Sequence, residues 1–249
     1  EETIAAFKAR GAEVTDGAFG ENLVVSGYDF TKFPVGTRFT CKDVVLELTQ
    51  IGKECHHGCE IFQKMGECIM PTNGVFAKVL HGGKISVGDE FHVQYRAAVI
   101  TLSDTASKGE REDASGAAVE EIVRKEGYEV VFKKIIPDDG DSLTALLCEL
   151  SDEDKADLIL TTGGTGFSQR DNTPEATMRA VERETPGISE AMRYYSLQIT
   201  PRAMLSRGVS GIRKEALIVN LPGSPKAVRE CLEYAIGALT HGIDILKGN

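Results

Sequence analysis

Residues 161–175 decide the fold of the second half of the chain, and they read TTGGTGFSQRDNTPE. An apolar run, 156–160, leads into this stretch, and a helix-compatible run follows Pro174. A glycine loop therefore lies between a buried strand and the N-terminus of a helix, where unpaired backbone N–H groups and the helix dipole favour phosphates and other anions. The loop also carries Asp171, whose carboxylate can hold a metal ion or orient a hydroxyl group.

Strands and helices alternate downstream of Arg96, which predicts a parallel sheet covered by helices on both faces. Apolar runs predict strands over 97–102, 128–136, 157–160 and 216–220. Helical spacing predicts helices over 114–126, 142–150, 174–184 and 226–246. Asp141 or Ser142 is expected to cap the second of these helices, and Pro174 opens the third. We therefore expect a three-layer α/β domain with a mostly parallel sheet over residues 96–249.

The first part of the chain has a different character, because short β-branched runs alternate with glycine turns. These runs predict strands over 35–40, 43–49, 75–80, 84–87 and 90–95, and only 2–10 has a helical pattern. Short strands with frequent turns indicate a small β-rich, barrel-like domain over residues 1–95. The boundary lies near Tyr95 and Arg96, without a Pro- or Ser-rich linker.

Composition argues against several classes of function. The 249 residues carry a net charge of −10 with a pI near 5.1, whereas a general nucleic-acid-binding protein presents a basic face. No apolar run approaches the ~20 residues of a membrane helix, and the first residues do not predict a signal peptide. The 6 cysteines are irregularly spaced, which predicts reduced thiols and a cytoplasmic protein. Cys41, Cys148 and Cys231 stand in apolar contexts and are expected in the core.

Four loops of the second domain follow strand ends, where ligands bind in an open parallel sheet. Backbone donors, hydroxyls and carboxylates together suit a phosphorylated ligand with Mg²⁺, for which Asp138 and Asp171 are the candidate ligands. Each motif alone also fits a plainer interpretation, namely a tight turn, a solvated N-cap or a rigid bend. That the four loops share one end of the sheet indicates a binding site more strongly than any single motif does. The further candidate binding residues in these loops are Ser103, Asp104, Gly163, Gly164, Thr165, Gly166, Pro222, Gly223 and Ser224.

Five motifs of the second domain follow one another in a specific order. They are SDTASKGEREDASG (103–116), IPDD (136–139), TTGGTGFSQRDNTPEAT (161–177), SRGVSGIR (206–213) and NLPGSPKAV (220–228). In these motifs the domain resembles the molybdopterin-binding domains of the MogA/MoaB type. The resemblance implies a trimer that binds molybdopterin, the pterin dithiolene of the molybdenum cofactor. It also implies an adenylyltransferase that joins molybdopterin to the AMP part of ATP, with Mg²⁺, and releases pyrophosphate.

The resemblance assigns roles to particular residues. Asp138 matches the functional aspartate of the family's PDD/PDE motif, and Asp171 matches the one in its RDxTPE motif. The 163–166 loop and Gly223-Ser224 match regions that contact the pterin-nucleotide ligand. Asn172 departs from the family's pattern, in which an aliphatic residue is more usual, and this puts the local geometry beside Asp171 in question.

Four motifs of the first domain are PVGTRF (34–39), LTQIGKECHHGCEIF (48–62), CIMPTNGVFAKVL (68–80) and GGKISVGDEF (82–91). They resemble a MOSC domain, a β-rich module linked to molybdenum and sulfur handling. The agreement begins inside the family's pattern, so we expect an N-terminally partial domain. MOSC domains are thought to use a cysteine thiolate, and Cys55, Cys59 and Cys68 are the candidates for molybdenum or sulfur handling. These cysteines also fit as small core residues.

Together these features predict an enzyme of molybdenum cofactor biosynthesis, in which the second domain adenylylates molybdopterin and the MOSC domain handles metal or sulfur. The alternative is a non-catalytic carrier that binds molybdopterin or the molybdenum cofactor. Later molybdenum-insertion proteins are expected partners, and neither nucleic acid nor a membrane is. A sugar- or nucleotide-binding α/β protein is a third interpretation, against which the five ordered motifs count. Pyrophosphate release that depends on ATP and Mg²⁺ distinguishes the enzyme from the carrier.

Overall fold

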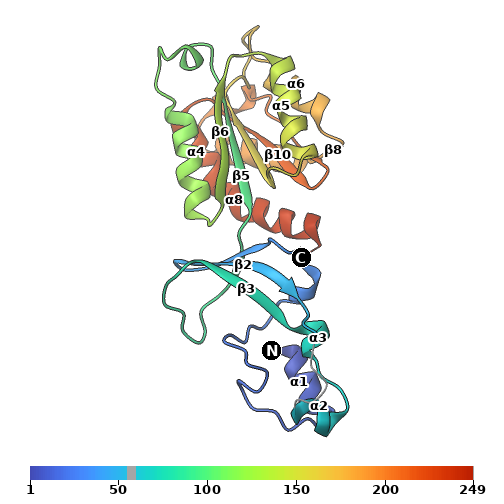
Figure 1. Cartoon of the computed structure of the whole chain (residues 1–249). Helices are drawn as coiled ribbons and strands as arrows, with labels where there is room; N and C mark the ends of the chain where they lie inside the picture. Colours follow the sequence, from blue (N-terminus) through green and yellow to red (C-terminus); the bar gives the residue numbers. More distant parts are fainter. Residues whose placement is uncertain (55–59, 249) are drawn as a thin grey trace. The chain divides into compact units, whose positions relative to one another are not determined.

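The structure is a computed structural model that describes residues 1–54 and 60–248 (Figure 1). The chain forms two compact units, Glu1–Gln94 and Tyr95–Asn249. The first unit contains an antiparallel sheet, and the second contains a larger, mostly parallel one. Among the helices in the described ranges, none combines the length and the apolar character that crossing a membrane requires.

The first unit is built on a sheet with the strand order β3-β2-β1-β4. Its strands are β1 (Arg38–Cys41), β2 (Val44–Ile51), β3 (Val75–His81) and β4 (His92–Val93). Its helices are α1 (Glu2–Ala9), η1 (Phe30–Lys32), α2 (Glu60–Met65) and α3 (Met70–Asn73). Phe33, Phe39 and Leu48 are buried in its core, and further aromatic side chains pack around them. The β-rich character predicted for this part of the chain is confirmed.

Two strands predicted in the first unit are wrong or too long. Residues 84–87 form no strand, because the chain turns at Val87 and Gly88, where Gly88 has φ +91° and Val87 is fully exposed. The strand predicted over 90–95 is reduced to two residues, since only these pair with β1. Residues 84–87 therefore belong to a loop rather than to the sheet, although they include β-branched residues.

The second unit contains a sheet with the strand order β6-β5-β7-β10-β9-β8. β5 (Arg96–Leu102), β6 (Glu129–Ile136), β7 (Leu158–Thr162) and β10 (Ala216–Leu221) are mutually parallel. β9 (Ser210–Arg213) runs antiparallel to β10, and β8 (Arg183–Glu184) runs antiparallel to β9. Because β5 lies between β6 and β7, the winding of the chain reverses at this point, and open α/β sheets bind their ligands outside the carboxyl ends of the strands at such a reversal.

Helices cover both faces of this sheet (Figure 1). α5 (Gly140–Asp152) packs beside α6 (Thr173–Ala180), while α4 (Ala114–Lys125) and α7 (Pro186–Leu197) each pack beside the long α8 (Pro225–Lys247). Side chains alternate between the faces of a strand, and Ile100 and Leu102 of β5 share a buried cluster with Leu143 of α5. The predicted three-layer α/β architecture is confirmed.

Several boundaries in the second unit differ from the prediction. The helix expected over 174–184 ends at Ala180, because Val181 is extended and the chain then pairs with β9. The sequence patterns did not predict α7 or β9. The cap of α5 is Asp139, whose carboxylate accepts the N–H of Ser142, and not Asp141 or Ser142 itself.

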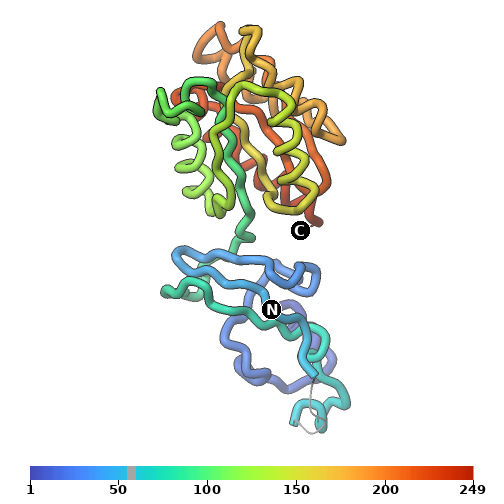
Figure 2. Tube along the Cα trace, turned by 45° about the horizontal axis from the view of Figure 1, so that its top comes forward, coloured from blue at the N-terminus to red at the C-terminus, as the bar shows by residue number. Residues whose placement is uncertain are grey.

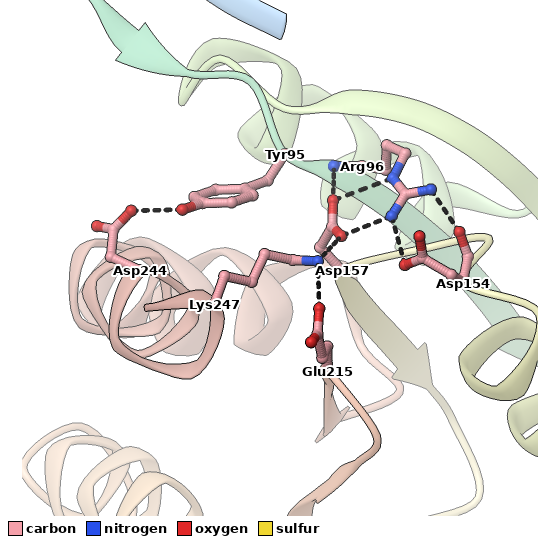
Figure 3. Close-up of polar contacts among 7 residues, drawn as sticks. All are labelled: Tyr95, Arg96, Asp154, Asp157, Glu215, Asp244 and Lys247. Atoms are coloured by element: carbon pink, nitrogen blue, oxygen red, sulfur yellow. Dashed lines mark hydrogen bonds and ion pairs between the residues drawn. The ribbon is translucent and has the colours of Figure 1, made fainter. Parts of the chain in front are cut away.

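At the amino edge of this sheet, the buried side chain of Asp157 forms ion pairs with residues of two other elements (Figure 3). The side chain of Asp157 is 4% exposed and accepts hydrogen bonds from the backbone N (2.7 Å) and Nη2 (2.8 Å) of Arg96. Nζ of Lys247, at the end of α8, lies 2.8 Å from the same carboxylate. Burial alone would raise the pKa of Asp157, but the hydrogen bonds from these two cations outweigh burial and hold the pKa below its ordinary value. The first strand of the unit is thereby joined to its last helix.

Candidate functional site

The four loops singled out in the sequence meet at the carboxyl edge of the sheet. Thr162, the last residue of β7, pairs with Leu221, the last residue of β10, and with Thr101 of β5. β6 ends at Ile136, which pairs with Leu102 of β5. The loop after β5 (green) and the loop after β7 (gold) lie at the same end of the second unit in both views (Figures 1 and 2). Candidate residues that are far apart in the sequence are therefore neighbours here.

Asp104 and Asp138 join the first two loops. The N–H of Asp104 donates to Oδ2 of Asp138 at 3.0 Å, and the N–H of Asp138 donates to Oδ1 of Asp104 at 3.1 Å. Arg170, from the loop after β7, donates to both carboxylate oxygens of Asp104, at 3.0 Å from Nε and 2.8 Å from Nη2. These contacts tie together the loops that follow β5, β6 and β7.

The two carboxylates differ in how their charge is balanced. The hydrogen bonds from Arg170 lower the pKa of Asp104, and the N–H of Asp138 adds to that effect. Burial raises the pKa of Asp138; the N–H of Asp104 opposes this rise, and the negative charges of Asp104 and Asp171 add to it. Asp138 thus carries a negative charge that its surroundings do not fully compensate, and a bound cation would relieve it.

The glycine loop passes so close to its neighbours that its first two positions exclude a side chain. Gly163 has φ +99°, and a Cβ there would lie 2.3 Å from the carbonyl oxygen of Leu102. Gly164 has φ +63°, and its Cβ would lie 2.3 Å from the hydroxyl of Thr173 and 3.5 Å from Oδ1 of Asp138. The same hydroxyl donates to the carbonyl of Gly163 at 2.9 Å. The loop is therefore held directly against the Asp138 carboxylate.

Asp171 lies against the other end of the same loop. The N–H of Ser168 donates to Oδ2 of Asp171 at 2.9 Å, and a Cβ on Gly166 would come within 2.9 Å of that oxygen. Asp138 and Asp171 therefore face one loop at Gly164 and Gly166. Asn172 buries its side-chain oxygen with no hydrogen-bond partner among the residues that the structure describes, so this departure from the family's pattern has a local energetic cost.

The loop after β10 completes the edge beside Gly163. A Cβ on Gly223 would lie 3.4 Å from the Cα of Gly163, and the hydroxyl of Ser115 donates to the carbonyl of Gly223 at 2.7 Å. The carbonyl of Pro222 accepts a hydrogen bond of 2.7 Å from the last residue of β7. The hydroxyl of Ser224 caps the N-terminus of α8. The backbone of this segment, rather than the Ser224 hydroxyl, is what the structure places next to the glycine loop.

Ser103 and Thr165 have contacts that hold their own loops in shape. The hydroxyl of Ser103 accepts the N–H of Ala106 at 3.1 Å, at the start of η2 (Ala106–Lys108). Thr165 is 8% exposed, and its carbonyl accepts the N–H of Arg207 at 2.9 Å. Both residues lie at the edge where they were expected, in positions that support the backbone there.

A pocket of about 500 Å³ opens beside the glycine loop, and its walls are Phe167, Ser168, Gln169, Asp171 and Arg207. Phe167 is 70% exposed in this position. Sequence reasoning gave Arg207 no role, although Arg207 belongs to the 206–213 motif. Its place directly before a glycine in an ordered motif was the one signal that could have singled it out.

The donor set at this edge fits Mg²⁺. Asp138 and Asp171 supply carboxylate oxygens, and proteins usually bind Mg²⁺ through one or two carboxylates together with phosphate oxygens of a substrate. Over residues 1–54 and 60–248, no group of 3 or more His, Cys, Asp or Glu side chains is placed to hold a metal ion. A magnesium ion at the carboxyl edge would therefore complete its coordination with oxygens of water or of a phosphorylated ligand.

The structure describes one of the three cysteines that were predicted to handle molybdenum or sulfur. Cys55 and Cys59 lie outside the described residues. Cys68 is half-buried just before α3, and its thiol forms no disulfide with another cysteine that the structure describes. The remaining three cysteines behave much as expected: Cys41 and Cys231 are buried, and Cys148 is partly buried against the core of the second unit.

This edge geometry is accompanied by clear similarity to known proteins. The family model described as "Probable molybdopterin binding domain" matches residues 98–241, so the chain belongs to this family. The model for the MOSC domain matches residues 1–92. A molybdopterin adenylyltransferase of Helicobacter pylori is 43% identical over 153 residues, which are 61% of this chain and 87% of that protein. The corresponding protein of Escherichia coli K12 is 44% identical over 155 residues, which are 59% of this chain and 79% of that one.

Solved structures show the same similarity for the second unit. The molybdopterin biosynthesis enzyme MoaB from Thermus thermophilus superimposes with a TM-score of 0.60 at 42% identity, covering 63% of this chain and 98% of that one. The Mog protein from Mycobacterium ulcerans gives a TM-score of 0.58 at 35% identity, with coverage of 63% and 99%. The resemblances to the MogA/MoaB and MOSC families are thereby confirmed.

Proposed function

We propose that the second unit is a molybdopterin adenylyltransferase that uses ATP and Mg²⁺. The observation that carries this proposal is the convergence of Asp138 and Asp171 on one glycine loop at the carboxyl edge of the sheet. Backbone N–H groups suit anions and paired carboxylates suit a cation, and a complex of phosphates with Mg²⁺ needs both. The adenylyltransferases that are 43% and 44% identical to this chain support the same reaction.

The reaction has to bring two anions together. A phosphate oxygen of molybdopterin attacks the α-phosphorus of ATP; a P–O bond forms, and the bond from that phosphorus to the bridging oxygen breaks, so pyrophosphate leaves with the electron pair. Asp138 and Asp171 would hold Mg²⁺, which supplies neutralisation of the phosphate charge. The backbone donors of the glycine loop orient the phosphates, and the Arg170–Asp104 pair keeps the flanking loops together around them.

We further propose that the MOSC domain, residues 1–95, handles molybdenum or sulfur through Cys55, Cys59 or Cys68, beside an adenylyltransferase domain of residues 96–249. A homotrimer and later molybdenum-insertion proteins as partners follow from the family resemblance. Large apolar side chains on α7 and on η3 (Pro201–Leu205) support an assembly surface, because Tyr194 is 67% exposed and Met204 is 64% exposed.

The test measures pyrophosphate release by the full chain from ATP, Mg²⁺ and freshly prepared molybdopterin, with each of the three omitted in turn. The proposal expects release only when all three are present. Tight molybdopterin binding without release would replace the enzyme with the carrier alternative. A chain that neither binds molybdopterin nor releases pyrophosphate would contradict both.

A further inference from the structure

Arg207 makes hydrogen bonds with the loop that carries the glycines and Asp171, and with the helix that follows this loop. Its Nε donates to the carbonyl of Gly166 at 2.7 Å, and its Nη2 donates to the carbonyl of Asp171 at 2.6 Å. Its Nη1 donates to the carboxylate of Glu175 in the first turn of α6. Its backbone N–H donates to the carbonyl of Thr165 at 2.9 Å. One side chain thus spans the loop from its glycines to the helix that follows.

These contacts fix Asp171 from two sides. Arg207 holds the Asp171 carbonyl and the Gly166 carbonyl at once, so the distance between these two residues is set by one rigid guanidinium. On the other side, the N–H of Ser168 holds Oδ2 of Asp171, and the N–H of Asp171 donates to the carbonyl of Ser168 at 3.0 Å. A carboxylate constrained in this way has its orientation set before any ligand arrives, which is what a metal-binding position requires.

The chemistry of arginine explains why this residue type stands here. A guanidinium presents planar donors in a fixed fork, so it can bridge two carbonyls and a carboxylate, whereas a lysine ammonium is a point charge on a flexible stem. Glu175 offsets the positive charge of Arg207 at the site. The side chain of Arg207 is 32% exposed, so the contacts lie at the wall of the pocket rather than in the core.

We propose that Arg207 is a positioning residue: through the carbonyls of Gly166 and Asp171 it sets the place of the Asp171 carboxylate for Mg²⁺. This inference rests on the proposed function. In this role Arg207 acts through the backbone of the loop that carries Asp171. Its removal is expected to weaken the response to Mg²⁺ and to slow turnover, while molybdopterin binding through the other loops stays close to that of the unaltered protein.

Arg213 offers a matched control in the same segment of chain. Its Nε and Nη2 donate to the carboxylate of Asp152 at 2.9 and 2.6 Å, and its Nη1 donates to the carbonyl of Ala180 at 2.9 Å. Like Arg207, Arg213 thus binds both a carboxylate and a backbone carbonyl. It does so away from the glycine loop, so Arg213→Ala reports what the loss of such a set of contacts does to folding alone.

The experiment compares Arg207→Ala, Arg207→Lys and Arg213→Ala in the full chain. For both Arg207 variants we expect the Mg²⁺ concentration at half-maximal pyrophosphate release to rise about 10-fold and kcat to fall about 10- to 100-fold, because a small displacement of a reacting group costs this much. We expect Arg213→Ala to leave the Mg²⁺ response unchanged. Added guanidinium ion should partly restore Arg207→Ala and not Arg207→Lys. An unchanged Mg²⁺ response in the Arg207 variants, or an equal shift in Arg213→Ala, would overturn the proposal.

Hydrogen exchange tests the role of Arg207 without any turnover, so its result does not depend on the proposed function. The amide of Ser168 reports the Asp171 side chain directly, because that amide donates to Oδ2. Hydrogen exchange at this amide should be faster in Arg207→Ala and unchanged in Arg213→Ala. If the unaltered protein released no pyrophosphate, the proposed function would fail, and the exchange rates would still decide the role of Arg207. Equal exchange in all variants would overturn it whatever the activity.

Discussion

The two edges of the parallel sheet in the second unit differ in the charges that surround a carboxylate. At the amino edge, the side chain of Asp157 is 4% exposed and is met by two cations, Arg96 and Lys247, which hold its pKa down (Figure 3). At the carboxyl edge, Asp138 is half-buried, and its pKa is raised by burial and by the charges of Asp104 and Asp171. The charge of Asp157 is balanced by neighbouring cations, whereas the charge of Asp138 is not fully balanced.

The difference separates stability from function within one sheet. A buried carboxylate that protein cations surround is part of the folded structure, and its loss deprives those cations of their buried partner. A carboxylate that stands near other carboxylates disfavours folding and is available to a cation from outside. Substitutions at the two edges should therefore change different properties. Those at the carboxyl edge should affect turnover, and those at the amino edge should affect the free energy of unfolding.

The largest effect is expected from Asp171→Asn. The amide still accepts the N–H of Ser168 but has no charge for Mg²⁺, so pyrophosphate release should fall by about 10²- to 10³-fold. The free energy of unfolding, measured by urea denaturation, should change by less than about 1 kcal/mol. Turnover equal to that of the unaltered protein would remove Asp171 from the metal site.

The next effect in size is expected from Asp157→Asn. Removing this charge should lower the free energy of unfolding by about 3 kcal/mol, because Arg96 and Lys247 lose their buried partner. The control is Asp154→Asn, which removes a partner of Arg96 whose side chain is 71% exposed, and it should cost no more than about 1 kcal/mol. Equal losses in the two variants would show that burial does not distinguish the pairs.

The pH dependence of stability sharpens the same comparison. The pKa of Asp157 in the folded protein lies below the ordinary value of 3.8, so its stabilisation is present above that pH and is lost as the pH falls through the folded-state pKa. The stability difference between the unaltered protein and Asp157→Asn should therefore be constant near neutral pH and shrink in strong acid. Urea denaturation across this range measures it, and a difference that grows on acidification would contradict the assignment.

A smaller effect is expected from Gly164→Ala. This position has φ +63°, and the added Cβ would meet the hydroxyl of Thr173 at 2.3 Å, so we expect a loss of stability of about 1–3 kcal/mol. Turnover should fall as well, because Thr173 would have to move and its hydroxyl holds the carbonyl of Gly163 in the same loop. Thermal unfolding and pyrophosphate release check the two parts separately.

The smallest effect is a gain in stability, expected from Gly237→Ala as the counterpart of Gly164→Ala. Gly237 is an exposed residue in the interior of α8, and a Cβ there would meet no described atom within 4 Å. Alanine should stabilise the helix by about 0.5–1 kcal/mol and leave turnover unchanged. A loss of stability at Gly237 would contradict the expectation that an open position inside a helix gains from alanine.

Much of the fold could be predicted from the sequence, because the buried strands are apolar runs and the helices repeat with a helical period. Leu158–Thr162 and Pro225–Lys247 are examples that the patterns located to within a few residues. The patterns failed where pairing rather than local composition decides the structure. Arg183–Glu184 is a strand because it pairs with β9, and residues 84–87 are a loop because they pair with no strand.

The candidate site was predictable in its carboxylates and glycines, since these lie next to recognisable strand ends. The contacts between them were not. Nothing local to Asp104 shows that it exchanges hydrogen bonds with Asp138, and nothing local to Arg207 shows that it reaches back to Gly166. Such contacts join segments far apart in the chain, and only the folded structure brings them together.

The most direct test of the contrast between the two edges measures turnover and stability together in the unaltered protein, Asp171→Asn and Asp157→Asn. Pyrophosphate release is expressed per folded molecule, and the free energy of unfolding is taken from the same preparation. The account predicts that Asp171→Asn loses turnover and keeps its stability, while Asp157→Asn loses stability and keeps its turnover. If Asp171→Asn kept its turnover, or if both variants lost the same property, the division of roles between the carboxyl and amino edges would be contradicted.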